Sequence, residues 1–430
     1  MSEHERERGR NYKKKYISKD TPKSIDKNCF AILQKTREHG EEVTNSPKKI
    51  TKETESSSNI SGISSSCSEA QHLSNLKCMH KAVKFLDDGT LLTENLQEYV
   101  HENSDFLVVG IVGQQSVGKS TLANLLANKR VNKDLLYELI LKKHQSENGI
   151  ETCTNRFSNI DINEVGSEKE IFKVESVDDI ENNKNRTSGI DVFISDNRVI
   201  FLDCQPITSM SIMDDLVENE NKRSNLLSEF IPSENSGEIQ ALQITSFLMS
   251  VCHILIVVQD WFFDSNICRF IQTAEMLKPT MTNADDELSE HCLHLLLVHN
   301  KATVDDFSPS VFKTIQKTYK SIFNKSKLVI DSSLGIATGR LVKHLNPESC
   351  GPALNIFLIP EYVESEAISF RGYPTMEEII KKLRANIFGA TKHPLTHVQL
   401  TEKTWLVYCS KVWENVRKSS FFVEYTKLMP

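Results

Sequence analysis

One short segment of the sequence has the residue types and spacing of a phosphate-binding loop. Residues 113–120 read GQQSVGKS and fit the pattern GxxxxGK[ST] at every position. Glycines let backbone N–H groups turn toward phosphate oxygens, the lysine reaches the β and γ phosphates, and the serine hydroxyl can bind Mg²⁺. We predict that a purine nucleoside triphosphate or diphosphate binds here, through Gly113, Gln114, Gln115, Ser116, Val117, Gly118, Lys119, Ser120 and Thr121.

Two polar residues further along the chain are candidates for a magnesium site with Ser120. Asp203 ends an apolar run, where proteins with this loop place a second carboxylate near the metal. Thr187 precedes another apolar run, where a switch threonine contacts Mg²⁺ and the γ-phosphate. Each has an ordinary interpretation as well, Asp203 as a turn former and Thr187 as a polar loop residue.

The residues after Asp203 lack the groups that hydrolysis needs. Active GTPases carry DxxGQ here, with a glycine amide that senses the γ-phosphate and a glutamine that orients water. This chain has Pro206 and Ile207 at those two positions. Proline has no N–H, isoleucine cannot bond a water, and Gln205 comes two positions early. We therefore expect very slow or absent hydrolysis and assign no catalytic residue.

The loop that reads the base is also altered. Guanine-specific proteins use [NT]KxD, whose aspartate accepts two hydrogen bonds from the base. Here Asn300 and Lys301 are followed by Ala302 and Thr303, and one threonine hydroxyl cannot replace a carboxylate. The aspartates at 305 and 306 could substitute if the loop shifts. Asn300 and Lys301 are therefore candidate base-binding residues, and both GTP/GDP and ATP/ADP stay open as ligands.

Apolar runs alternate with helical stretches in the rest of the chain, which predicts an α/β fold. The order favours a GTPase-like P-loop NTPase domain with a mostly parallel sheet, flanking helices and an antiparallel edge strand at 190–194. The predicted core strands are 106–112, 199–203, 252–258, 293–298 and 354–359. The predicted helices are 119–129, 238–250, 265–277, 308–323 and 375–388.

Composition divides the chain into four parts. Residues 1–75 have few large apolar residues and are predicted to be a disordered tail, and 76–104 form a lead-in segment. The GTPase-like domain spans 105–390, with insertions near 142–184, 208–236, 280–290 and 325–352. The last part, 391–430, is helical. One helix face there either packs on its own domain or binds a partner; it carries Trp405, Tyr408, Val412, Trp413 and Val416.

Charge and hydropathy exclude several classes of protein. Residues 1–66 carry a net charge of +4 and the remainder −11, which argues against extensive direct nucleic-acid binding. The longest apolar run, 251–258, is too short to cross a bilayer, and the N-terminus has no signal-peptide core. We therefore expect a cytoplasmic protein. None of the ten cysteines stands at CxxC spacing, so we expect reduced, buried thiols.

Three stretches of sequence resemble one family. They are TSGID at 187–191 with IFLDCQP at 200–206, VVQDWF at 257–262 with FIQTAEM at 270–276, and LTEKTW at 400–405 with VRKSS at 416–420. Together they resemble the family of the ninth SMG protein of nonsense-mediated mRNA decay, over about residues 80–430. The combination is specific, because neither DxQP nor VVQDW is general to GTPases.

The resemblance implies a regulatory and assembly subunit. It implies a G-like domain that pairs with the eighth SMG protein. Together they would bind the SMG phosphatidylinositol-3-kinase-related kinase, which phosphorylates the helicase Upf-one. On residues alone, two alternatives stay open: an active GTPase or ATPase switch, and a small nucleotide kinase. The kinase would need an Arg-rich lid, and residues 208–300 contain only Arg223 and Arg269.

Overall fold

The computed structural model describes most of the chain beyond the predicted tail. The described residues are 77–141, 170–182, 184–223, 233–260, 263–279, 291–362 and 372–428. The tail at 1–75, the insertion at 280–290 and most of the insertion at 142–184 lie outside them, as does Trp261 of the VVQDW motif. In the described part, no helix is long and apolar enough to cross a membrane.

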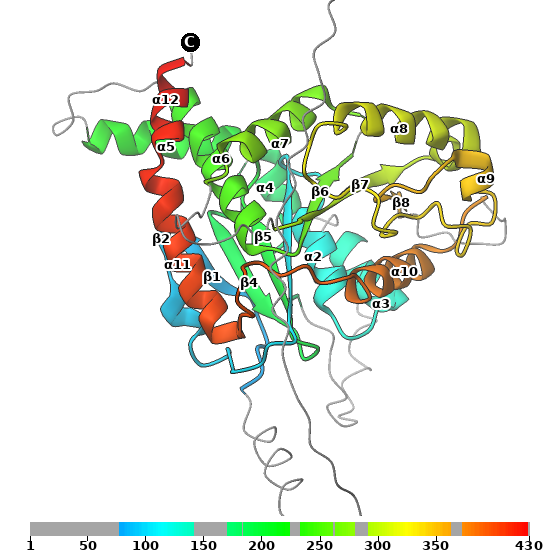
Figure 1. The fold of residues 1–430 in the computed structure, drawn as a ribbon, viewed down its shortest axis with the longest axis horizontal. Helices are drawn as coiled ribbons and strands as arrows, with labels where there is room; N and C mark the ends of the chain where they lie inside the picture. Colours follow the sequence, from blue (N-terminus) through cyan, green and yellow to red (C-terminus); the bar gives the residue numbers. More distant parts are fainter. Residues whose placement is uncertain are drawn as a thin grey trace, which may run out of the picture. The chain divides into compact units, whose positions relative to one another are not determined.

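A single eight-stranded sheet organises the described residues, with the strand order β2-β1-β4-β5-β3-β6-β7-β8 (Figure 1). The strands are β1 (Val83–Asp87), β2 (Thr90–Leu91), β3 (Leu107–Gly113), β4 (Ile190–Ile194), β5 (Val199–Cys204), β6 (Ile254–Gln259), β7 (His294–Ala302) and β8 (Ile356–Pro360).

The strands from β5 to β8 in the sheet order are parallel. β3 pairs with β5 on one side and with β6 on the other, and β6–β7 and β7–β8 continue the parallel pairing. Every residue of β3, β5 and β6 is buried, as expected for parallel strands covered by helices on both faces. The prediction of an α/β fold with a mostly parallel sheet is confirmed.

The antiparallel end of the sheet differs from the prediction. β4 does pair with β5 in antiparallel register, Val192 opposite Leu202, but it is not an edge strand. β1 covers its other side, with Val83 opposite Val192, and β2 continues from β1 as a hairpin. The lead-in segment therefore belongs to the sheet. Its strand is short and half-buried, and its partner lies about 100 residues away in sequence, so no local pattern indicates the pairing.

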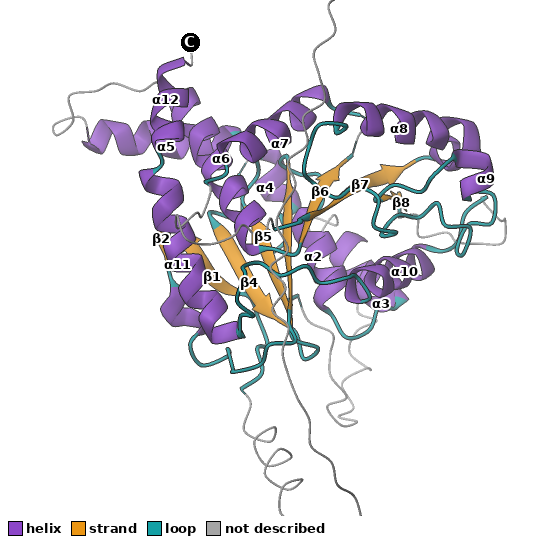
Figure 2. Ribbon diagram, viewed as in Figure 1, coloured by secondary structure: helices purple, strands orange, loops and turns teal. Residues whose placement is uncertain are grey.

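Helices pack on both faces of the sheet (Figure 2). Helix α2 contacts β3, β5 and α10, whereas α6 contacts β3, α5, α7, α11 and α12. Helix α5 lies within the predicted insertion at 208–236. The α-helices are α2 (Lys119–Ala127), α3 (Lys133–Leu136), α4 (Val177–Glu181), α5 (Met210–Arg223), α6 (Ser233–Val251), α7 (Ser265–Leu277), α8 (Pro309–Ile322), α9 (Pro347–Cys350), α10 (Met376–Phe388), α11 (Glu402–Lys418) and α12 (Ser420–Leu428).

The apolar face of α11 packs on its own domain. The Trp405 ring stacks on Phe85 of β1 with 5.9 Å between ring centroids, and its Nε1 donates to the Val251 carbonyl oxygen at 3.0 Å. Trp413 packs edge-on against Phe247 of α6. Both tryptophans are buried. Of the two uses left open for this face, the structure shows intramolecular packing.

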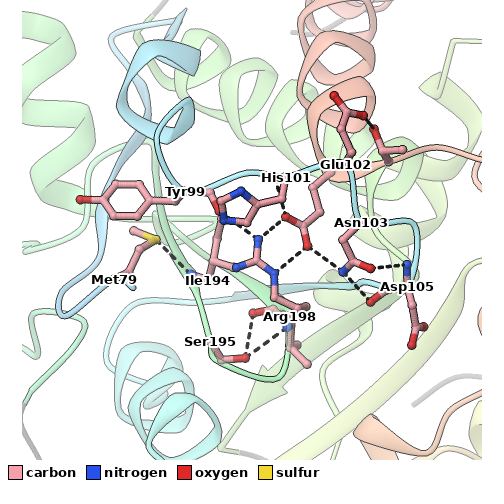
Figure 3. A network of polar contacts seen from close by, with 12 residues as sticks. Met79, Tyr99, His101, Glu102, Asn103, Asp105, Ile194, Ser195 and Arg198 are labelled. Atoms are coloured by element: carbon pink, nitrogen blue, oxygen red, sulfur yellow. Dashed lines mark hydrogen bonds and ion pairs between the residues drawn. The ribbon is translucent and has the colours of Figure 1, made fainter. Parts of the chain in front are cut away.

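A buried ion pair between Arg198 and Glu402 fixes the start of α11 to the sheet. Figure 3 shows Arg198 with its neighbours Tyr99, His101 and Asn103. Glu402, fully buried, accepts from Arg198 Nε at 2.7 Å, from the His101 backbone N–H at 2.9 Å and from Asn103 Nδ2 at 3.0 Å. Arg198 also donates to the Tyr99 carbonyl oxygen at 2.9 Å. One carboxylate therefore connects α11, the turn between β4 and β5, and the segment that leads into β3.

Candidate nucleotide-binding site

The loop of residues 113–118 connects β3 to α2, and two glycines shape it. Gly113 lies where an added Cβ would be 2.3 Å from the Val258 carbonyl oxygen of β6. Gly118 has a φ of +92°, and an added Cβ would be 2.6 Å from Asn300 Nδ2. A larger residue would clash at either position, so both glycines allow the loop to pass close to neighbouring strands.

The N-terminus of α2 and the side chain of Lys119 face the same space. No described side chain caps this helix, so its first N–H groups are free to bind an anion, which the helix dipole favours. Lys119 is buried, and its Nζ donates to the Gln114 carbonyl oxygen at 2.6 Å. Burial lowers the pKa of Lys119, while the nearby carboxylates of Asp203 and Glu175 oppose that shift.

The three predicted magnesium ligands meet beside this loop. Ser120 Oγ donates to Asp203 Oδ2 at 2.6 Å and lies 3.4 Å from Thr187 Oγ1. Thr187 Oγ1 is 3.5 Å from the same carboxylate oxygen. Residues 67 and 83 positions away from Ser120 therefore converge on it, as the sequence predicted.

Asp203 has one oxygen that is available to a cation. The residue is fully buried, and its Oδ1 has no hydrogen-bond partner among the described residues. Burial raises the pKa of Asp203 to about 7, against the opposing effects of the Ser120 hydrogen bond and the Lys119 charge. A hard cation that takes oxygen ligands fits this set, with Asp203, Ser120 and Thr187 as the residues that would hold it. Bound Mg²⁺ would neutralise phosphate charge there.

The described hydrogen-bonding groups of the segment after β5 are bonded to other parts of the chain. The backbone N–H of Ile207 donates to the Gly113 carbonyl oxygen at 3.0 Å. Gln205 is buried: its Oε1 accepts from the Gly189 N–H at 2.8 Å, and its Nε2 donates to Gln240 at 3.4 Å. The Gln205 side chain is therefore bonded to the residue before β4 and to α6.

Asn300 and Lys301 lie at the carboxyl end of β7, beside the loop. Asn300 Nδ2 donates to the Val117 carbonyl oxygen at 2.9 Å, so this side chain braces the phosphate loop. Lys301 forms an ion pair with Asp260 at 3.4 Å. Asp306 is held by the N–H and hydroxyl of Thr303 at 2.7 and 2.9 Å. Among the described residues, the lining of the cavity includes neither Thr303 nor Asp305 nor Asp306.

A cavity of about 520 Å³, large enough for a nucleotide, lies beside the loop. Its lining includes Gly118, Lys119, Ser120, Thr187, Asn300 and Lys301. Its described lining contains two carboxylates that the sequence analysis missed, Glu175 and Glu361. Ser116 Oγ donates to Glu175 Oε2 at 2.9 Å. Glu361 directly follows β8, and the position of a residue just beyond a parallel strand was a usable signal for it. No motif indicates Glu175.

The segment that carries Thr187 is attached to β1. Lys84 Nζ donates to the Ser188 carbonyl oxygen at 2.5 Å and pairs with Asp191 at 2.9 Å. Ser188 Oγ donates to Asp87 at 3.2 Å. Gly189 follows with a φ of +61°, where an added Cβ would be 2.0 Å from the Leu86 carbonyl oxygen. The sheet thus holds the residues that follow Thr187 in place.

Comparisons with known proteins agree with the resemblance in the sequence. A family model described as Smg8_Smg9 matches residues 101–302. The chain is 32% identical to "Nonsense-mediated mRNA decay factor SMG9" of Salmo salar, over 81% of this chain and 68% of that protein. It is 33% identical to the protein of that name from Xenopus tropicalis, over 82% and 67%. "Protein SMG9" of Drosophila melanogaster is 24% identical over 80% and 59%.

Proposed function

The chain belongs to the SMG9 family of nonsense-mediated mRNA decay factors, and from this premise we propose that it is a nucleotide-holding regulatory subunit. In this proposal its P-loop domain binds a purine nucleoside triphosphate or diphosphate with Mg²⁺ and turns it over slowly or not at all. The bound nucleotide stabilises the fold, and the folded domain serves in assembly.

The groups around the loop of residues 113–118 support nucleotide binding by their arrangement. Ser116 and Gly118 of the loop, the uncapped N-terminus of α2 and buried Lys119 all line one cavity of about 520 Å³. Ser120, Thr187 and the free oxygen of Asp203 meet at the same place. Phosphate groups and their magnesium ion need this combination of donors, positive charge and oxygen ligands.

The contacts around the phosphate side support retention without turnover. Proline at 206 has no N–H to contact a γ-phosphate, and the N–H of Ile207 already donates to Gly113. The Gln205 side chain is bound to Gly189 and Gln240. The attachment of Ser188 to β1 opposes the order-to-disorder change by which GTPase switches respond to hydrolysis.

The role in complex assembly comes from the family. We propose that the chain acts in nonsense-mediated mRNA decay by pairing with the eighth SMG protein and the SMG kinase, as a regulatory subunit in the cytoplasm. The Smg8_Smg9 match covers 101–302, which contains the loop of residues 113–118, Thr187, Asp203 and the strands from β3 to β7.

Mass spectrometry of the denatured, freshly purified protein tests the nucleotide part directly. We expect close to one purine nucleotide per chain in the wild type and a clear loss in Lys119→Ala, because Lys119 is the cation facing the phosphates. Loss of the ligand should also lower the melting temperature, since a ligand that binds only the native state stabilises it. An identical nucleotide content and melting temperature in both proteins would contradict the proposal.

A further inference from the structure

A second polar cavity lies between the segment 333–353 and helix α10. Its volume is about 360 Å³, and it shares no described residue with the nucleotide cavity. Arg340 and Lys382 bring two positive charges to its lining, together with the hydroxyls of Ser333 and Thr338 and the amide of Asn386. No carboxylate is among the described lining residues. In a chain of net charge −7, such a cavity is strongly biased toward anions.

Neither cation is neutralised within the described part of the chain. The ion pairs found there include neither Arg340 nor Lys382, whereas the adjacent Lys381 pairs with Glu377 one turn earlier. Lys382 is half-buried and Arg340 is exposed, and both line the cavity. Two cations with no counter-charge between them repel each other and favour an anion.

The cavity also offers one hydrogen-bond donor that the described residues leave unused. Thr338 Oγ1 is buried and has no partner among the described residues. A buried hydroxyl without a partner is unfavourable, so a ligand oxygen that accepts from it is stabilised. Asn386 Nδ2 donates to the Leu334 carbonyl oxygen at 3.0 Å, which fixes the orientation of its amide beside the cavity.

The loop that carries these groups is closely packed. An added Cβ on Gly335 would lie 1.9 Å from the Leu354 carbonyl oxygen, and Gly339 has a φ of +72°. Leu334 and Ile336 are buried in the core. This loop lies in the predicted insertion at 325–352. The Ile336 N–H donates to the Ile356 carbonyl oxygen of β8 at 2.9 Å, so the backbone that carries Thr338 is positioned before any ligand arrives.

We propose that this cavity binds a phosphate group, either inorganic phosphate or a phosphate monoester. A guanidinium can donate two parallel hydrogen bonds to phosphate oxygens, an ammonium adds a point charge, and the two hydroxyls donate to the remaining oxygens. The site is separate from the nucleotide site and does not rest on the proposed function.

Titration of inorganic phosphate into the Lys119→Ala protein, followed by ³¹P NMR at constant ionic strength, tests the site without the phosphate loop. We expect binding to persist in this background and to weaken at least tenfold when Arg340→Gln and Lys382→Gln are added. The matched pair Lys320→Gln and Lys343→Gln removes two exposed lysines and should change binding less than twofold. A parallel titration with O-phosphoserine distinguishes a monoester from free phosphate by which of the two binds more tightly.

A second variant separates binding from folding. Thr338→Val removes the unpartnered hydroxyl and should weaken phosphate binding at least threefold without lowering the melting temperature, since no protein contact is lost. Loss of all phosphate binding in Lys119→Ala alone would overturn the site. Equal weakening by Arg340→Gln with Lys382→Gln and by the control Lys320→Gln with Lys343→Gln would also overturn it. Neither result would bear on nucleotide retention, which the wild-type and Lys119→Ala proteins test separately.

Discussion

Glu175 is the residue whose position is least expected in a phosphate-binding site. Its carboxylate accepts from Ser116 Oγ of the phosphate loop and is close enough to Lys119 to affect the pKa of that lysine. A negative charge here attracts Lys119 but repels the phosphates of a nucleotide. Glu175 therefore lines the candidate site and competes with a phosphate group for the Ser116 hydroxyl and the Lys119 charge.

Glu175→Gln should tighten the binding of a nucleoside triphosphate. The amide can still accept from Ser116, while the repulsion is removed; a half-exposed charge is worth roughly 0.5–1 kcal/mol, so we expect about a two- to fivefold lower Kd. Calorimetric titration of the nucleotide-free protein measures it, and the gain should shrink at high salt. Asp178→Asn, an exposed change of equal charge outside the cavity, is the control. An unchanged or weaker affinity in Glu175→Gln would exclude this role.

Polar contacts hold helix α11 and the segment that leads into it at two places. The first is the Arg198–Glu402 pair, and the second is a histidine cluster beside β6 and β7. His253 Nδ1 accepts from the Val108 N–H at 3.0 Å, and His291 Nε2 bonds the Cys252 carbonyl oxygen at 2.8 Å. His294 bonds the Thr391 carbonyl oxygen at 2.9 Å, in the segment that leads to α11.

Removing Glu402 should be strongly destabilising. Glu402→Ala leaves Arg198 mostly buried without its counter-charge, which costs about 3 kcal/mol in the free energy of unfolding. Urea unfolding measures this, and Arg198→Ala with Glu402→Ala should lose clearly less than the sum of the single changes. Glu414→Ala on the same helix breaks only an exposed pair with Lys418 and should cost less than about 0.5 kcal/mol. Equal losses for the two glutamates would contradict the role given to the buried pair.

The histidine cluster should make stability depend on pH. Burial lowers the pKa of His253 to about 3 and that of His291 to about 4. The unfolded chain then binds more protons between these values and its own histidine pKa of about 6.5, so stability rises with pH across this window and is lost as pH falls from about 6.5 toward 4. For His291 alone the loss is about 3 kcal/mol.

Unfolding by urea at a series of pH values checks this prediction. His291→Gln keeps a donor for the Cys252 carbonyl oxygen and removes the titrating group, so its stability should fall less steeply between pH 6.5 and 4. His80→Gln changes an exposed histidine and should keep the wild-type slope. The prediction is wrong if His291→Gln and the wild type lose stability in parallel.

For the whole molecule, the sequence predicts the parallel half of the sheet better than the antiparallel half. β3, β5, β6, β7 and β8 are apolar runs that are visible locally, and each lies within a few residues of its predicted position. β1 is a five-residue strand whose place depends on contacts with residues about 100 positions later. The convergence of Ser120, Thr187 and Asp203 was predictable because Asp203 ends one predicted strand and Thr187 precedes another.

Other parts of the site could not be predicted because they depend on tertiary packing. Nothing in the sequence near Gln205 shows that its side chain is bound to Gly189. Nothing near Asn300 shows that its amide braces Val117. Nucleotide binding and the absence of turnover stay predictions, as does the proposed stabilisation of the domain by its nucleotide.

Single-turnover hydrolysis with excess protein tests whether the protein holds a nucleoside triphosphate without hydrolysing it. Nucleoside triphosphate labelled at the γ-phosphate is mixed with Mg²⁺ and the wild-type protein, and released phosphate is followed for hours beside Lys119→Ala. With Pro206 and Ile207 in place of the hydrolytic residues, we expect the label to remain on the nucleotide and the two proteins to release phosphate equally slowly. Release that is clear in the wild type and disappears in Lys119→Ala would contradict the account.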